Sequence, residues 1–150
     1  MSEIKVTPAR PDDKAAWLPL FEGYRDFYRQ PADPAVAERV WAWIHDPAHP
    51  TCCLLARDAG GAIIGLAHYR ELPRPLSGTN AGFLDDLFVV PAARGSGAAE
   101  ALIDAIAAEG AARGWSWLRW FTAEDNYRAR ALYDRVAGLS QWKTYQRDIG

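Results

Sequence analysis

Residues Leu84–Ile103 read LDDLFVVPAARGSGAAEALI, and the architecture of the chain follows from them. Apolar strand formers come first, then arginine and glycine, then small helix-forming residues. This order predicts a strand over Phe83–Val90, a tight loop at Arg94–Gly97, and a helix over Gly97–Arg113 that Gly114 ends. The sequence offers no side chain to cap that helix, so its first backbone amides lack partners. A helix end of this kind binds phosphate.

The loop is suited to a ligand that approaches the backbone closely. After Arg94 it carries no side chain larger than serine until the helix is under way. A pyrophosphate would accept hydrogen bonds from the free amides and would meet the positive end of the helix dipole. By itself, however, the pattern also fits a glycine turn that merely starts a helix. It lacks the lysine and hydroxyl of a P-loop and the third glycine of a dinucleotide fingerprint.

Outside this stretch, hydrophobic periodicity predicts further strands and helices in the order β-α-α-β-β-β-α-β-α-β. We expect strands over Glu3–Thr7, Thr51–Arg57, Ala62–Arg70, Ser116–Thr122 and Gln141–Ile149, and helices over Lys14–Arg29, Pro34–His45 and Asn126–Ala137. The Pro- and Gly-rich segment Pro73–Gly82 is predicted to be a loop. With neither a repeat nor a linker, residues 1–150 are expected to form a single α+β domain with a mixed sheet.

Composition excludes several classes of function. A net charge of −2 and an isoelectric point near 5.9 argue against nonspecific nucleic-acid binding. Apolar runs fall short of the roughly 18 residues that span a bilayer, and there is no secretory leader, so we expect a cytoplasmic protein without membrane contact. The adjacent Cys52 and Cys53 and three scattered histidines show no metal-ligand spacing. We therefore expect no metal.

Three segments together resemble the GNAT family of N-acetyltransferases. The loop Arg94–Ala99 fits the family signature (Q/R)xxGx(G/A), and the strand Leu84–Val89 resembles the strand that precedes it. The later run Asn126–Tyr133, NYRARALY, resembles the family segment NxxAxxLY. The resemblance is closest to small-amine enzymes of the polyamine type and to related members that acetylate proteins or amino acids. It implies a mostly antiparallel, twisted sheet whose central strands splay apart.

The resemblance also implies that acetyl-CoA is the co-substrate and indicates which residues hold it. Backbone groups of the strand end would hold the pantetheine arm, loop amides the pyrophosphate, and Asn126 the pantetheine from the opposite side. The residues implied to bind acetyl-CoA are Leu87, Phe88, Val89, Arg94, Gly95, Ser96, Gly97, Ala98, Ala99, Glu100 and Asn126. Glu100 departs from what a phosphate site favours, since its carboxylate should weaken binding unless it points away.

Direct transfer to an amine needs a route for a proton. An amine with a pKa of about 10.4 is only about 0.04 % neutral at pH 7, so reaching the neutral form costs roughly 4 to 5 kcal/mol. Asp85 is the best candidate base, although a carboxylate that only anchors a cationic substrate fits equally well. Strand alternation places Asp86 on the other sheet face, where we expect it to bind substrate.

Tyr133 is the candidate acid. The resemblance places it beside the sulfur, where it would stabilise the departing thiolate. A phenol pKa of about 10 against about 8.5 for a thiol makes full proton transfer uphill, so a hydrogen bond is the stronger expectation. Helical spacing alone would instead favour a tyrosine packed in the core.

The first two helices are expected to form the acceptor wall. Glu22 and Tyr24 there suit a cationic amine, although a solvated acidic helix face explains Glu22 as well. We expect an acetyl-CoA-dependent N-acetyltransferase that acts on a small primary amine. Acetylation of a protein lysine or an amino acid, or a noncatalytic acyl-CoA sensor, remain alternatives. A homodimer is also expected from the resemblance.

Overall fold

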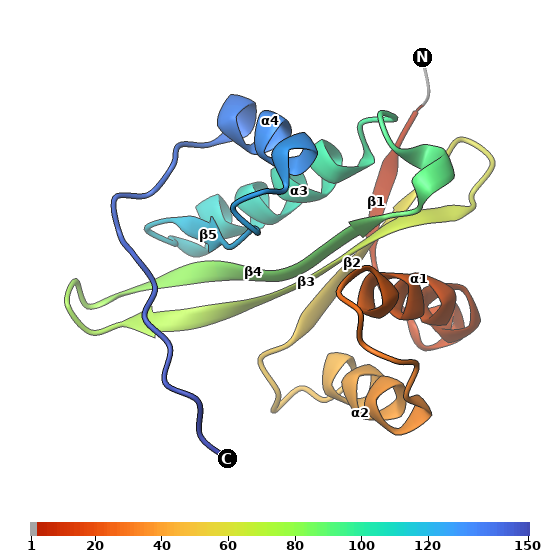
Figure 1. Ribbon diagram of the computed structural model, residues 1–150, viewed down its shortest axis with the longest axis horizontal. Coiled ribbons are helices and arrows are strands. Elements are labelled where there is room, and N and C mark those ends of the chain that lie inside the picture. Colours follow the sequence, from red (N-terminus) through yellow and green to blue (C-terminus); the bar gives the residue numbers. More distant parts are fainter. Residues whose placement is uncertain (1–2) are drawn as a thin grey trace.

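A computed structural model describes residues 3–150 as a five-stranded sheet with two helices on each face (Figure 1). The strands follow the order β1-β2-β3-β4-β5; all neighbours are antiparallel except β4 and β5, which are parallel. The strands are β1 (Lys5–Pro8), β2 (Cys52–Arg57), β3 (Ile63–Arg74), β4 (Thr79–Val89) and β5 (Leu118–Trp120). The helices are α1 (Lys14–Phe27), α2 (Pro34–Ile44), α3 (Ala98–Arg113) and α4 (Tyr127–Val136), with single 3₁₀ turns η1 (Pro11–Asp13) and η2 (Pro91–Ala93). The α+β prediction is confirmed.

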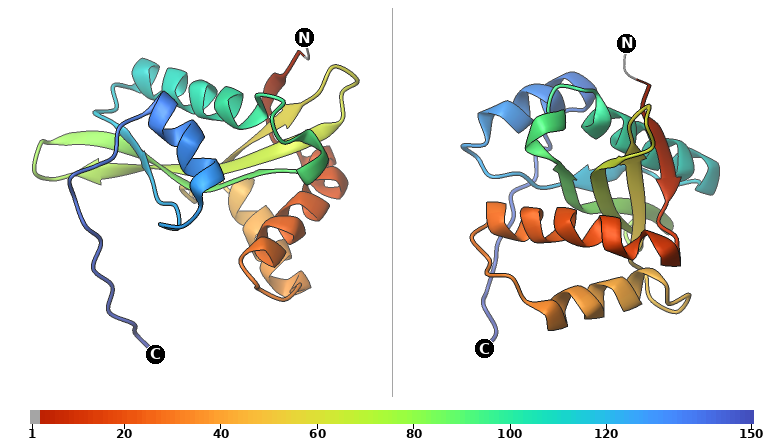
Figure 2. Two further views of the ribbon diagram at one scale, coloured as in Figure 1. Left: turned by 45° about the horizontal axis from the view of Figure 1, so that its top comes forward. Right: turned by 90° about the vertical axis from the view of Figure 1, so that its right-hand side faces the viewer.

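Strand alternation divides the core into two layers. Leu55 and Leu66 face α1 and α2, whereas Leu54 and Ala67 face α3. Figure 2 shows the two helix pairs on opposite sides of the sheet. The α1–α2 layer is built on buried aromatic rings; Trp17 is fully buried and stacks on Phe21 at 4.8 Å. Each layer buries apolar surface that stabilises the sheet between them.

The predicted start of α2 and the predicted end of α3 are confirmed, and local chemistry explains both. Asp33 accepts hydrogen bonds from the amides of Ala35 and Val36 and starts α2, with Pro34 at its first position. Gly114 ends α3 in the left-handed conformation, with φ of 77°, which suits glycine.

The segment Pro73–Gly82, predicted to be a loop, is largely strand. β3 continues to Arg74 and β4 begins at Thr79, so only a short turn joins them. Pairs such as Leu72 with Ala81 extend the antiparallel ladder out to the tip. The prediction was wrong because it weighed local composition alone, whereas pairing with a neighbouring strand overrides weak local preference.

The C-terminal prediction also fails. Residues 141–149 form no strand; the chain leaves α4 and runs away from the body as an extended segment (Figure 1). β5 is shorter than the predicted Ser116–Thr122, and within residues 3–150 no strand pairs with its outer edge. A period-2 pattern shows only that a segment suits a sheet edge, and here the segment does not meet one.

The predicted splay of the central strands is confirmed. β4 and β5 pair only from Gly82 with Leu118 to Leu84 with Trp120, and β4 then continues to Val89 paired with β3 but no longer with β5. Just beyond that point the β3–β4 ladder slips, because Tyr69 faces Leu84 while His68 faces Asp86. Asp85 is thus the extra residue of a β-bulge. Such a bulge bends the strand and redirects its side chains.

In the described residues, no helix is both long and apolar enough to cross a bilayer.

Candidate active site

A cavity of about 580 Å³ opens where β4 and β5 part. Its walls come from α1, the end of β4, the loop before α3, the end of β5, and α4. It is lined by all eleven residues expected to bind acetyl-CoA and by both candidate catalytic residues, Asp85 and Tyr133. Sequence positions about 50 residues apart therefore meet around one space.

The loop before α3 forms the part of the cavity wall where the sequence predicts that the pyrophosphate binds. Gly95 and Gly97 adopt φ of 83° and 92°, and a Cβ added to either would meet nothing within 4 Å. Two amides are engaged within the loop, since Ser96 donates to the Ala93 carbonyl and Ala98 donates to the Ser96 hydroxyl. The other amides of the first helical turn and the helix dipole are available to an anion.

Three arginines contribute positive charge to the cavity wall. Arg94, Arg128 and Arg135 all line it. Arg135 forms an ion pair with Glu100 at 2.9 Å, which offsets the carboxylate that the sequence placed near the phosphates. Sequence analysis missed Arg128 and Arg135. Their spacing in the sequence could have indicated them, because residues seven positions apart on a helix lie on the same face.

Tyr133 lies on α4 with its ring edge-to-face against Trp120, 5.4 Å between centroids. Burial, with a smaller effect from Tyr28, raises the pKa of Tyr133 above that of a free phenol. The hydroxyl is therefore protonated at neutral pH and able to donate a hydrogen bond into the cavity. Asn126 caps α4 by accepting from the Ala129 amide at 3.4 Å, and this places it on the cavity wall.

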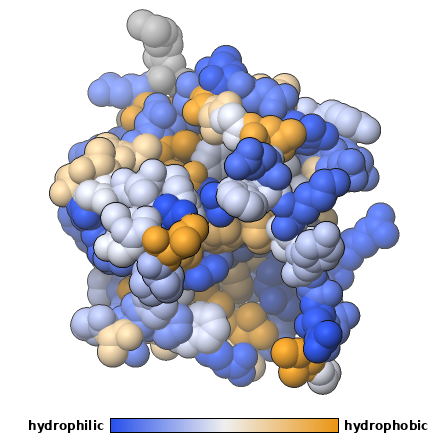
Figure 3. Space-filling view, turned by 90° about the vertical axis from the view of Figure 1, so that its left-hand side faces the viewer, coloured by the Kyte–Doolittle hydropathy of each residue, from blue (hydrophilic) through white to orange (hydrophobic). Residues whose placement is uncertain are grey.

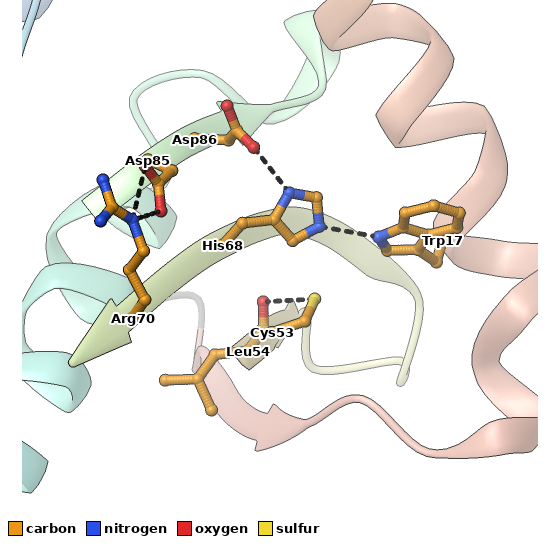
Figure 4. Close-up of polar contacts among 7 residues, drawn as sticks. All are labelled: Trp17, Cys53, Leu54, His68, Arg70, Asp85 and Asp86. Atoms are coloured by element: carbon orange, nitrogen blue, oxygen red, sulfur yellow. Dashed lines mark hydrogen bonds and ion pairs between the residues drawn. The ribbon is translucent and has the colours of Figure 1, made fainter. Parts of the chain in front are cut away.

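The two aspartates of β4 do not lie on opposite sheet faces as predicted. Asp86 accepts a hydrogen bond from His68, and Asp85 pairs with Arg70 (Figure 4). His68 and Arg70 are two residues apart on β3 and share a face. Both carboxylates are therefore on the α1 side of the sheet. The prediction assumed strict alternation, which the bulge at Asp85 interrupts.

Asp85, on the cavity wall, is engaged by a cation. The Arg70 Nε lies 3.2 and 3.0 Å from its two oxygens. Both side chains remain more than a third exposed, so a substrate can compete for either partner. Asp85 is thus engaged by Arg70 and is not left free on the cavity wall.

Asp86 is held by His68, a histidine that is buried in the core. His68 Nδ1 lies 2.8 Å from Asp86 Oδ2, and His68 Nε2 lies 3.1 Å from the Trp17 indole nitrogen. His68 is only 2 % exposed. Sequence analysis set it aside as an ordinary histidine, because nothing in the local sequence shows which strand residue it faces.

The acceptor side of the cavity is mainly aromatic. Tyr24, Phe27 and Tyr28 of α1 line it together with Phe121. Glu22 is exposed on α1 and is not among the lining residues. Trp41 of α2 is buried in the same core layer as Trp17 and does not line the cavity.

This arrangement of sheet, splay and glycine loop matches known proteins. The acetyltransferase (GNAT) family model matches residues 17–139. The chain belongs to this family. It is 30 % identical over 146 residues to the D-amino-acid N-acetyltransferase HPA3 of Saccharomyces cerevisiae. The aligned region covers 97 % of this chain and 91 % of that protein.

Solved structures agree with the fold of this acetyltransferase. A ribosomal-protein-alanine N-acetyltransferase from Brucella melitensis biovar Abortus 2308 superposes with a TM-score of 0.78 and 28 % identity, covering 98 % of this chain and 100 % of that one. A probable acetyltransferase superposes with a TM-score of 0.87 at 20 % identity, covering 97 % and 98 %.

The chain is therefore an N-acetyltransferase, and acetyl-CoA is its co-substrate. The polyamine-type subgroup expected from the sequence is not the one that these relatives represent, since their names refer to D-amino acids and to a protein alanine. Within residues 3–150, no group of three or more His, Cys, Asp or Glu is arranged to hold a metal ion.

Proposed function

We propose that this acetyltransferase transfers acetyl directly from acetyl-CoA to a small primary amine, without a covalent enzyme intermediate. One observation carries the proposal: a single cavity joins the glycine loop at α3 to Asp85 and Tyr133. The loop amides, Arg94 and Asn126 would hold the cofactor, and the end of β4 would hold its pantetheine arm. The amine would then enter from the aromatic side formed by α1.

The chemistry fits the side chains at that junction. Asp85 attracts an alkylammonium group, and the aromatic rings of α1 favour a cation by cation–π contact. Tyr133, kept neutral by its raised pKa, donates a hydrogen bond to the sulfur as the thiolate departs. A hydrogen bond to a charged group contributes about 1.5 to 3 kcal/mol, which corresponds to about 10- to 150-fold in rate.

An amino acid is the second candidate acceptor, and the pair Arg70–Asp85 favours it. The two groups lie 3.0 Å apart and are both partly exposed, and Asp85 lines the cavity. An amino acid carries a cation and an anion one carbon apart, so its ammonium suits Asp85 and its carboxylate suits Arg70. The relative that acts on D-amino acids supports the same candidate.

Matched acceptors separate these two candidates. Alanine in both enantiomers and ethylamine differ by the carboxylate, and release of free thiol from acetyl-CoA reports turnover with each. If the acceptor is an amino acid, alanine gives the higher kcat/KM and Arg70→Gln removes that advantage without slowing ethylamine. If the carboxylate is irrelevant, both amines react alike in both proteins. Absence of thiol release with any small amine would overturn the proposed acceptor class.

We also propose that two copies associate through the C-terminal segment. Leu139, Trp142, Tyr145 and Ile149 are between 69 % and 95 % exposed, and the nearby outer edge of β5 pairs with no strand within residues 3–150. The side that carries the β3–β4 hairpin shows small, separate apolar clusters and no single continuous apolar patch (Figure 3). Strand pairing between copies would satisfy the open edge and cover these side chains.

Light scattering tests this association. It should give a dimer for the full chain and a monomer for a chain ending at Ser140, and a monomeric full chain would contradict the proposal.

A further inference from the structure

The chain of hydrogen bonds between α1 and the sheet points to a role that neither the cofactor site nor the acceptor site uses. Trp17 on α1, His68 on β3 and Asp86 on β4 lie in a row, as Figure 4 shows, with N–N and N–O distances of 3.1 and 2.8 Å. Trp17 is fully buried and His68 nearly so. A buried polar chain of this kind is costly unless each member is satisfied.

The chemistry of the indole fixes the state of the histidine. A tryptophan nitrogen only donates, so His68 Nε2 must accept and carries no proton. The proton of the neutral ring is then on Nδ1, which donates to Asp86. His68 has no free lone pair left, and turning away would leave the indole N–H unpaired in the core. It therefore orients Asp86 and does not itself take up a proton.

Tyr24 connects Asp86 to the cavity. It lines the cavity wall, whereas Asp86 does not. Burial, the charge of Asp86 and a hydrogen bond to that carboxylate raise the pKa of Tyr24 far above that of a free phenol. The phenol therefore stays protonated close to Asp86, and its oxygen has a lone pair for a donor that arrives from the cavity.

We propose that Trp17 and His68 are positioning residues that hold Asp86 as the final acceptor of the substrate ammonium proton, which reaches it through the Tyr24 hydroxyl. The proposal rests on the small-amine acceptor proposed above. It moves the base from Asp85, which Arg70 engages, to the neighbouring carboxylate that a neutral histidine orients.

The step balances as follows. One ammonium proton passes to the Tyr24 oxygen while the Tyr24 proton passes to Asp86, so an ammonium and a carboxylate become a neutral amine and a carboxylic acid. The amine nitrogen forms the new C–N bond to the acetyl carbon and the C–S bond breaks. The second proton lost from nitrogen balances the thiolate, which leaves as free thiol. Asp86 returns its proton to solvent before the next turnover.

The decisive kinetic test pairs ethylamine with trifluoroethylamine, which is similar in shape but largely neutral at neutral pH. Asp86→Asn and Tyr24→Phe should each lower kcat with ethylamine by about 10²- to 10⁴-fold, the usual effect of losing acid–base assistance. With trifluoroethylamine, the loss relative to wild type should shrink at least tenfold. Asp85→Asn is the matched control: it should raise KM more for the cationic ethylamine than for trifluoroethylamine, and it should leave the ratio of kcat between the two amines near that of wild type. Equal losses with the two amines in Asp86→Asn would overturn the proposal.

A second readout does not depend on activity. In protein labelled with ¹⁵N-histidine, the signals lost in His68→Asn identify His68 among only three histidines. The proposal requires a neutral His68 ring with the proton on Nδ1, and a ring protonated on Nε2 would overturn it. If wild type acetylates no small amine, the acceptor proposal fails, and this spectrum still decides whether the chain is arranged as described.

His68 itself is tested by two replacements. Asparagine keeps an N–H near the Nδ1 position, whereas leucine keeps none. His68→Asn should retain at least tenfold more kcat with ethylamine than His68→Leu, at matched thermal stability and unchanged acetyl-CoA affinity. Equal kcat in two folded variants would show that His68 only packs the core and would overturn its positioning role.

Discussion

Tyr133 and Gly97 represent the two roles proposed for the cavity, because Tyr133 is proposed to assist the reaction and Gly97 to help bind the cofactor. Tyr133 packs against Trp120 and keeps its proton, while Gly97 starts α3 with open space beside it. Both were named from the sequence through the family resemblance. Asp86 and His68 were not understood, because a one-residue bulge decides which face a strand side chain occupies.

Tyr133→Phe removes the hydroxyl and leaves the ring. We expect kcat to fall by about 10- to 100-fold, the effect of losing a hydrogen bond to a developing charge. The dissociation constant for CoA should stay within about twofold, since the contacts proposed for the cofactor come from the backbone and the α3 loop. Steady-state kinetics and calorimetry measure the two effects. Unchanged kcat would remove Tyr133 from the chemistry.

Gly97→Ala tests the phosphate end of the cavity. Its φ of 92° is unfavourable for any residue with a Cβ, and the added methyl group would face the open side of the loop. We expect acetyl-CoA affinity to fall at least tenfold. Gly78→Ala is the matched control, because φ there is 66° with equally open space, in the β3–β4 turn. Equal CoA affinity in both variants would show that the loop does not hold phosphates.

At the scale of elements, the position of α3 against the sheet depends on Trp115. Its indole donates to Glu71 and its ring fills the space left by two glycines, Gly82 on β4 and Gly110 on α3. A Cβ at Gly82 would lie 2.3 Å from the ring, and one at Gly110 would lie 2.4 Å from it. These elements were predicted from periodicity, but the requirement for glycine at their contact comes from packing that the sequence does not show.

Gly82→Ala or Gly110→Ala should therefore destabilise the protein by about 1 to 3 kcal/mol, the usual cost of overpacking a core. Gly60→Ala serves as control, since its Cβ would lie 3.5 Å from Asp58 Oδ1 at an ordinary φ. Urea unfolding measures all three. Two variants as stable as the control would mean that Trp115 does not fix α3.

Over the whole molecule, the sequence predicted the element order as far as α4, the sheet with helices on both faces, and the splay that opens the cavity. The prediction failed in two places where pairing between distant strands decides. It took Pro73–Gly82 for a loop, although the β3–β4 hairpin extends into it, and it took residues 141–149 for a strand, although they have no partner strand. Those two errors share a cause: strand pairing depends on neighbours that local composition does not reveal.

Stability should fall at alkaline pH. Burial raises the pKa of the Cys53 thiol, and it does so for the phenols of Tyr24 and Tyr69 as well. The folded protein thus keeps protons that the unfolded chain loses above about pH 9, so unfolding becomes more favourable as pH rises. Each group contributes up to about 1.4 kcal/mol per pH unit. The stabilisation from these three groups is complete when the pH is below the pKa values that they have in the unfolded chain.

Urea midpoints at about pH 8 and about pH 10 check this expectation, with Cys53→Ala as the comparison. The variant should lose less stability between the two pH values than wild type, because one of the ionising groups is gone. Parallel pH dependence in the two proteins would mean that the Cys53 thiol does not contribute.

The most direct test of the central claim follows one turnover of acetyl-CoA with ethylamine or alanine, measuring the free thiol and the mass of the product. We predict one N-acetylated amine for each CoA released and no thiol release without an amine. Tight acetyl-CoA binding with no thiol release for any amine, or an acetyl group left on the protein, would contradict direct transfer to a small amine.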